Sequence, residues 1–229
     1  HLRFKKDNSL GDSSGSSVTG TQGYLESQAG ITLTVDKCFN EGNNWDFYGP
    51  TTITRTYSRN WIYLRDSASS ISNSITLHLG LLATGITAMN CAIRQSIGGS
   101  VSGTNFTNCI FLNQGENSWW TSAPTFDYCI NIGGSYLPNN GTNVNGALLN
   151  TVLLAVGSDG NDQYFQLSEG SIAIGSGLNG ADIGPFGGNN PYMLSGMPGI
   201  PRMTRFSLPP TATGLTAVTV EVEAEAHPE

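Results

Sequence analysis

One short phrase recurs three times in the middle of the chain, each time with a cysteine between a polar residue and an apolar run. The copies are MNCAIRQ around Cys91, TNCIFLN around Cys109 and DYCINIG around Cys129. When they are aligned, Ser74 and Thr151 fall at the same position, and the successive steps are 17, 18, 20 and 22 residues. The pattern indicates a fold in which the chain comes back to an equivalent position about every twenty residues. Each time, that position requires a small, weakly polar side chain.

The segments between these positions have the composition of β-strands. Short runs of β-branched, apolar and aromatic residues, such as ITLTV at 31–35 and SITLHL at 74–79, are broken by Gly, Asn, Ser or Pro. A sandwich gives one side-chain type no reason to recur, because its strands run antiparallel and meet different neighbours. In a parallel solenoid, coils stack in register about 4.8 Å apart and like side chains form ladders. The sequence therefore predicts an all-β solenoid with an internal ladder of Ser74, Cys91, Cys109, Cys129 and Thr151.

Composition and charge restrict which partners the protein can bind and where it is located. Charged residues make up 12% of the chain and Gly numbers 29, which suits a turn-rich β protein and not a helical bundle. The net charge of −7 argues against nucleic acid as a partner, because phosphate binding needs a basic face. No apolar run reaches the roughly 18 residues that span a bilayer, so we expect no membrane insertion. Low charge with abundant Ser, Thr and Asn favours an extracellular or cell-surface protein.

The cysteines admit two interpretations, disulfides or buried free thiols. Parallel side chains on adjacent rungs give poor dihedral geometry for a disulfide. We therefore favour free thiols that pack as small hydrophobic groups. Because the sequence has no CxxC pair and no Cys/His cluster, it gives a zinc site little support.

A resemblance to a known family lies further along the chain. The stretch DQYFQLSEGSIAIGSGLNGADIGPFGG at 162–188 resembles the closing segment of many secreted bacterial β-helix proteins, close to F-x-L-x-x-G-S-P-A-I-x-x-G-x-x-G-x-D-I-G-x-x-G-G. It departs from that pattern at Ile172, where the family usually has Pro. The next stretch, NPYMLSGMPGIPRMTRFSLPP, is similar to the continuation of the closing segment in the same proteins. The resemblance implies a right-handed parallel β-helix of the pectate-lyase-like superfamily, which includes lyases, hydrolases, adhesins and tailspikes.

The closing segment also contains a literal G-x-G-x-x-G at Gly175, Gly177 and Gly180. A dinucleotide site would require a helix directly after it, so that the helix N-terminus meets the pyrophosphate. The ADIGPFGG that comes next cannot form that helix. We therefore interpret the glycines as tight turns of the last coils.

Catalytic residues are scarce where a β-helix enzyme would need them. A lyase needs a carboxylate cluster for Ca²⁺ and a basic group, and a glycosidase needs two carboxylates. Between residues 67 and 158 the charged residues are Arg94, Glu116 and Asp127, and the two acids fall at different phases of the repeat. We predict no catalytic residue. The alternative, a polysaccharide lyase or glycosidase, would need at least two acids to share one groove, from the set Asp46, Asp66, Glu116 and Asp127.

Two loops offer binding groups. Asp159, Asn161 and Asp162 in GSDGNDQ could supply oxygen ligands to Ca²⁺, although this is also ordinary turn sequence, and we expect no other cofactor. Trp119 and Trp120 are adjacent, so they cannot both point inward from one strand. Either at least one is exposed and binds sugar rings or a partner surface, or the loop folds back and covers a sheet edge.

The C-terminal AVTVEVEAEA at 217–226 alternates strictly. It is interpreted as a strand that pairs within the same domain, as a free tail, or as an acidic strand that meets the basic end of another copy. The two sides of that head-to-tail contact would be Glu221, Glu223 and Glu225 on one copy and Arg3, Lys5 and Lys6 on the next.

These features divide the chain into a solenoid at 1–190, with an N-terminal cap region and closing coils, and an extended β tail at 191–229. They predict a secreted or cell-surface structural or adhesive protein, with copies of itself and glycans as its partners and end-to-end filaments as its assembly. A carbohydrate-active enzyme or a glycan-binding module is the alternative function.

Overall fold

The computed structural model describes residues 25–40, 42–99, 103–112, 124–157 and 161–194 in full, and the backbone of three further strands. The chain divides into two compact units, His1–Ser195 and Gly196–Glu229. Among the residues that the structure describes, no helix has the length and apolar character needed to cross a membrane.

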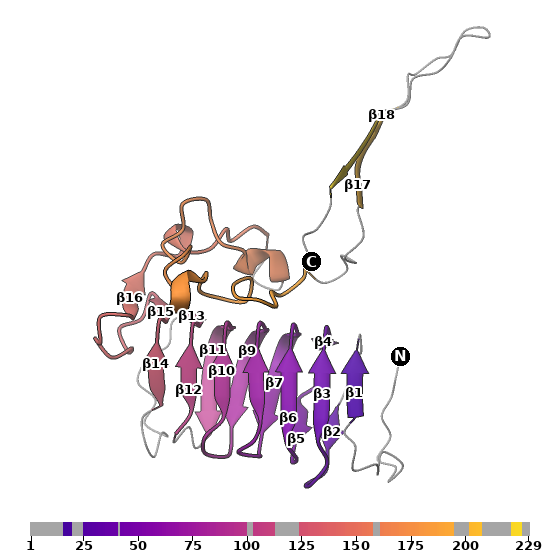
Figure 1. Cartoon of the computed structure of the whole chain (residues 1–229), viewed down its shortest axis with the longest axis vertical. Helices are drawn as coiled ribbons and strands as arrows, with labels where there is room; N and C mark the ends of the chain where they lie inside the picture. The colour runs from indigo at the N-terminus through magenta and orange to yellow at the C-terminus, as the bar shows by residue number, and fades with distance from the viewer. Residues whose placement is uncertain are drawn as a thin grey trace, which may run out of the picture. The chain divides into compact units, whose positions relative to one another are not determined.

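The first unit is a parallel β-solenoid of about six coils (Figure 1). Each coil contributes to two sheets, and all strand pairs in both sheets are parallel. The predicted all-β parallel solenoid is therefore confirmed. Sheet A consists, in spatial order, of β1 (Ser16–Thr19), β3 (Leu33–Asp36), β6 (Thr51–Thr54), β8 (Ser70–Ser72), β10 (Thr87–Met89), β12 (Asn105–Thr107) and β14 (Thr125–Asp127).

Sheet B holds the longer strands of the solenoid. Its spatial order starts at β16 (Val144–Ala147) and continues through β15 (Ile130–Ile132), β13 (Ile110–Leu112), β11 (Ala92–Gly99), β9 (Ile75–Leu81), β7 (Tyr57–Leu64), β5 (Trp45–Phe47) and β2 (Glu26–Ser27). The short β4 (Phe39–Asn40) pairs with the first part of β7. Register shifts interrupt the pairing of β7 with β9 and of β9 with β11, so sheet B bends where sheet A does not.

The interior is filled by one apolar side chain from the middle of each sheet A strand and by alternate residues of sheet B. The sheet A row is Val35, Ile53, Ile71, Ala88, Phe106 and Phe126, all of them buried. Ile62, Leu79 and Ile97 are successive rungs on the sheet B side. Side chains of a strand alternate between its faces, so the neighbours of these residues point outward.

A single left-handed residue joins each sheet A strand to the following sheet B segment. These turn residues have φ from 44° to 54° and are Lys37, Arg55, Asn73, Asn90, Asn108 and Tyr128. Asn tolerates this conformation better than most residues with a side chain. The recurring Asn before the ladder position is thus a backbone requirement of the turn.

The ladder residue follows each left-handed turn, and its side chain is anchored to the turn. Ser74 Oγ donates a hydrogen bond to the carbonyl oxygen of Ser72 (2.7 Å), and Cys91 Sγ donates to that of Met89 (3.2 Å). Cys109 and Cys129 make the same bond to the carbonyl two residues earlier. A small side chain with one weak donor is needed at this point, which explains why Ser, Thr and Cys alternate there.

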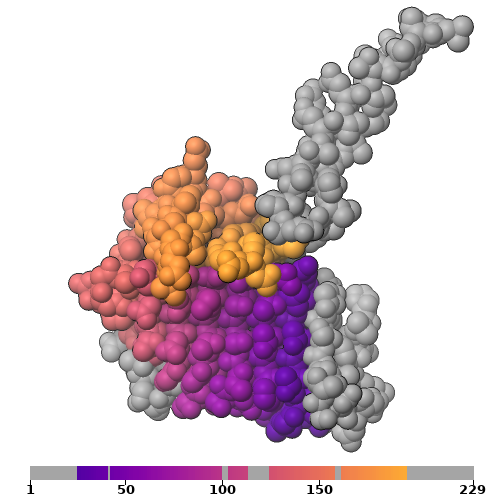
Figure 2. Space-filling view, viewed as in Figure 1, coloured from indigo at the N-terminus to yellow at the C-terminus, as the bar shows by residue number. Residues whose placement is uncertain are grey.

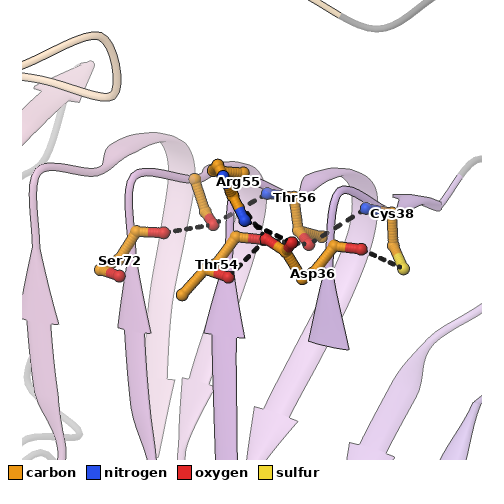
Figure 3. Close-up of polar contacts among 7 residues, drawn as sticks. Asp36, Cys38, Thr54, Arg55, Thr56 and Ser72 are labelled. Carbon is orange, nitrogen blue, oxygen red and sulfur yellow. Dashed lines mark hydrogen bonds and ion pairs between the residues drawn. The ribbon is translucent and has the colours of Figure 1, made fainter. Parts of the chain in front are cut away.

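The ladder begins at Cys38, two coils before the predicted first rung, Ser74. Thr56 Oγ1 donates to the Thr54 carbonyl (2.9 Å), and Cys38 Sγ donates to the Asp36 carbonyl (3.3 Å), as Figure 3 shows. The rungs are also linked to one another, because the Cys38 amide donates to Thr56 Oγ1 (3.4 Å). In the next coil, the Thr56 amide donates to Ser74 Oγ (3.1 Å).

The ladder ends at Asn143, and Thr151 lies outside it. β15 and β16 pair with Ile130 opposite Val144, so Asn143 takes the next rung, 14 residues after Cys129. Its Oδ1 accepts a hydrogen bond from the Cys129 amide (2.9 Å). Thr151 is exposed in the 3-10 turn η2 (Leu149–Thr151), where the chain has already left the coils.

All four cysteines are free and buried, as predicted. Burial raises the pKa of the Cys109 thiol well above its usual value, and the adjacent thiols of Cys129 and Cys91 raise it further. The Cys109 thiol therefore stays protonated at neutral pH and serves as a packing group.

The closing segment at 161–194 does not form further coils. It contains the 3-10 turns η3 (Asp162–Phe165) and η4 (Leu178–Gly180) and runs back along the side of the solenoid, over the row of left-handed turns (Figure 1, orange). Asn108 Oδ1 accepts from the Leu178 amide (2.8 Å). Further back, Asn73 Nδ2 donates to the Gly187 carbonyl (2.7 Å).

This lateral segment, which we call the cover, buries apolar residues on the outside of sheet B. Ile75, Ile110 and Ile130 are fully buried although they do not belong to the interior core. Gly184 lies directly on this row, because a Cβ placed there would be 2.7 Å from Ile110 Cδ1. Gly175 and Gly180 adopt left-handed turns, as expected of tight-turn glycines, but these turns belong to the cover and not to further coils.

The second unit is described by its backbone alone. β17 (Arg202–Ser207) and β18 (Glu221–Glu225) pair antiparallel. The register places Glu225 opposite Arg202 and Glu223 opposite Arg205. The acidic strand thus has a partner strand in its own unit.

Candidate binding surfaces

Several predicted site residues lie outside the described part of the chain, and the predictions on them stand untested. They are Arg3, Lys5, Lys6, Glu116, Trp119, Trp120 and Asp159.

Of the three predicted calcium ligands, the structure describes Asn161 and Asp162. Asp162 is 7% exposed, and its Oδ2 accepts a hydrogen bond from the Tyr192 hydroxyl (3.0 Å). Its Oδ1 accepts from the Gln163 amide (3.0 Å), so the carboxylate anchors the cover, and Asn161 precedes it as an exposed residue. No group of three or more His, Cys, Asp or Glu side chains in the described residues is arranged to hold a metal ion.

The acids proposed for an enzyme are held by other protein groups. Both oxygens of Asp46 accept from Arg65 (2.6 and 3.0 Å), and Asp66 accepts from the Ala68 amide in a turn (2.9 Å). Asp127 accepts from Asn140 (3.1 Å) at the far end of sheet A, four rungs beyond Asp46, which lies on sheet B. These three carboxylates do not share a groove.

A stack of rings crosses the outer face of sheet B, beyond the area that the cover buries. The rings of Trp61 and Tyr63 lie parallel, with centroids 5.3 Å apart and planes at 1°. On its other side Trp61 stacks on His78 (4.6 Å, 14°) from the next coil. All three side chains are partly exposed.

Arg65 and Tyr48 extend the stack at the Tyr63 end. The Arg65 guanidinium lies 5.7 Å from the centroid of the Tyr63 ring and 4.7 Å from that of Tyr48. Its bidentate ion pair with Asp46 fixes the guanidinium in place. Tyr48 is 42% exposed and is the most open ring of the five-residue stack. We call Tyr48, Arg65, Tyr63, Trp61 and His78 the ring stack.

Glycines in the following coils make room for the rings. A Cβ at Gly80, one rung after Tyr63, would lie 2.2 Å from a carbon of the Tyr63 ring. A Cβ at Gly98, two rungs after Tyr63, would lie 3.3 Å from the Trp61 ring. The large aromatics of β7 therefore lean over glycines of β9 and β11. In sequence terms, the signal was the pair of aromatics two residues apart in NWIYL, followed by Gly at the same phase in the next two coils.

Burial lowers the pKa of His78, and the nearby positive charge of Arg94 lowers it further. The imidazole is therefore neutral at pH 7 and stacks as an aromatic ring. The ring stack thus presents apolar ring surface beside a cation whose charge Asp46 balances.

Sheet A presents a different surface, made of small polar side chains. Figure 2 shows it as one continuous face, indigo to magenta, below the orange cover. At its N-terminal side Asp36 accepts from Arg55 Nε (2.8 Å) and Thr54 Oγ1 (2.6 Å) (Figure 3). Burial disfavours the charged form of Asp36, but these bonds outweigh it and hold the pKa of the carboxyl below its usual value.

No protein-family model, no curated protein and no solved structure matches the chain. The fold rests on the structure itself. The parallel solenoid is shown, and membership of the pectate-lyase-like superfamily stays a prediction from the closing motif.

Proposed function

We propose that the first unit is an extracellular adhesive solenoid that binds glycans through the ring stack on sheet B. The observation that supports it is the grouping of Tyr48, Tyr63 and Trp61 around Arg65, partly exposed and fixed by the Asp46 ion pair. Aromatic rings pack against the C–H faces of sugars, and nearby polar groups orient the hydroxyls. Because the rings are already packed together, little side-chain entropy is lost when a sugar binds.

Substitution of Tyr48, the most open ring, and of Trp61, which stacks on both Tyr63 and His78, tests this proposal. We expect Tyr48→Ala and Trp61→Ala each to weaken binding to the best glycan about tenfold, the effect of losing an aromatic contact of about 1.4 kcal/mol. The measurement is a glycan array with the intact chain, followed by calorimetric titration of the strongest ligand.

Leu148→Ala is the matched control, because Leu148 is 66% exposed and lies outside the ring stack. It should bind as the unmodified chain does. Equal affinity of all four proteins would overturn the role of the stack. Release of soluble sugar from the bound glycan would favour the enzyme alternative.

End-to-end assembly is a second candidate, favoured by the edge of β16. Among described strands β16 pairs with β15 alone, and Val144 on it is 40% exposed. At the same end of the solenoid, side chains cap the edge of sheet A. The Asn140 and Asn143 side chains donate hydrogen bonds to the Phe126 carbonyl of its last strand, β14 (3.0 and 2.8 Å). An open strand edge invites a strand from another copy.

We expect filaments in negative-stain micrographs of the concentrated protein, and their loss in Val144→Lys, which places a charge on the open edge. Thr142→Lys, two residues earlier, is less suitable as a control. Thr142 Oγ1 accepts a hydrogen bond from the Tyr128 amide, and the substitution would remove it. Thr84→Lys, in an exposed turn, is the control that should keep the filaments. Single particles at every concentration tested would refute the assembly.

A further inference from the structure

The strands of sheet A keep one register from end to end. Each of its pairs, from β1–β3 to β12–β14, aligns residue by residue without a shift. Sheet B has shifts in three of its pairs. The outward residues of sheet A therefore form straight rows along the solenoid.

Two such rows cover the outer face, and hydroxyl side chains dominate the first and fill half of the second. Thr or Ser fills five positions of the first row and three of the second. The first row is Thr34, Thr52, Ser70, Thr87, Asn105 and Thr125, and the second is Asp36, Thr54, Ser72, Met89, Thr107 and Asp127. Neither row contains Lys, Arg, Glu or an aromatic residue.

The strands that carry the two rows are anchored to the core by the buried residue between the rows. The residue between the two rows is buried in every strand of this face, from Val35 to Phe126. Thr52 and Thr87 are exposed, and their hydroxyls make no hydrogen bond in the described part of the protein. Their hydroxyl and methyl groups are therefore directed at solvent from strands that are paired on both sides.

Strand geometry fixes the spacing of this array. Neighbours along a row are about 4.8 Å apart, and the two rows are about 6.6 Å apart, twice the rise per residue. The face is thus a two-dimensional grid of hydroxyls and methyls with periods close to the repeat of oxygen atoms in ice. Water ordered between the methyls and bonded to the hydroxyls continues such a lattice at little further entropic cost.

We propose that the outer face of sheet A binds ice. The ligand is a periodic solid, because the face repeats the same backbone spacing from β3 to β14. The charge at its N-terminal margin is balanced, since Arg55 pairs with Asp36. The proposal is independent of the ring stack, which lies on sheet B.

The test measures thermal hysteresis and inhibition of ice recrystallisation with the intact chain. We expect both activities in the unmodified protein and their loss in Thr52→Lys and Thr87→Lys, which place a long, hydrated charge in the grid. Thr84→Lys is the matched control, because Thr84 is an exposed turn residue outside the rows, and it should keep full activity. Circular dichroism verifies that all variants are folded.

A second pair of variants tests the contribution of the methyl groups. Thr52→Val keeps the methyl group and replaces the hydroxyl with a second methyl, and it should retain most of the activity. Thr52→Ser keeps the hydroxyl but removes the methyl group, and it should lower the activity. Absence of hysteresis and recrystallisation inhibition in the unmodified protein would overturn the proposal. So would equal activity of Thr52→Lys and Thr84→Lys, or binding to crystalline cellulose or chitin with none to ice.

Discussion

Replacing Phe106 with alanine is expected to lower the free energy of unfolding of the solenoid by about 3–5 kcal/mol. Phe106 is 1% exposed. Its ring stacks on Phe126 of the next coil (5.2 Å, 9°) and meets the edge of Phe111 on sheet B (5.4 Å, 78°). The three rings join both sheets and two coils, so the cavity left by alanine is bounded by hydrogen-bonded strands that cannot collapse into it.

Urea unfolding followed by circular dichroism measures this loss. Phe106→Leu keeps most of the volume and should lose less than about 1.5 kcal/mol. Met89→Ala, at an exposed site on the same sheet, should change the stability by no more than about 0.5 kcal/mol. If Phe106→Ala unfolds at the same urea concentration as Met89→Ala, the three rings do not form the described core.

The ladder was predictable because one physical requirement is repeated in the sequence. A donor small enough to reach the carbonyl two residues back leaves Ser, Thr or Cys as the choice at each rung from Cys38 to Cys129. Cys38 and Thr56 meet the same requirement but were missed, and Lys37 and Arg55 precede them where three of the four later coils have Asn. The left-handed turn, and not the Asn itself, is the constant feature.

Where the solenoid ends was not predictable from spacing. Thr151, 22 residues after Cys129, fits the lengthening steps of the repeat better than Asn143, which follows after 14 residues. The pairing of β16 with β15 nevertheless places Asn143 on the next rung. The position of the cover is even harder to predict from the sequence, because it depends on hydrogen bonds such as that between Asn73 and Gly187, which are 114 residues apart. The ring stack likewise depends on contacts between coils, such as Trp61 with His78, that a strand-by-strand interpretation does not contain.

Gly187→Ala is expected to detach the cover while the coils stay folded. A Cβ at Gly187 would lie 2.0 Å from the carbonyl oxygen of Asp182, a backbone atom that no rotamer change can move away. The Gly187 carbonyl also accepts the buried amide groups of Asn73 and Asn90 (2.7 and 3.3 Å). Displacing it leaves both donors without this partner, at a cost of about 1–3 kcal/mol each.

The expected signature is local, because the interior core and the ladder do not use the cover. Limited proteolysis should cleave Gly187→Ala within 161–194, and an apolar dye should bind the uncovered row of Ile75, Ile110 and Ile130. Gly42→Ala is the control, since its added Cβ meets no atom within 4 Å. Cleavage of both variants at the same rate would mean that the cover is already loose in the unmodified chain. Loss of all β-sheet signal in Gly187→Ala would mean instead that the coils require the cover to fold, and that the outer apolar row is as essential to the solenoid as its interior.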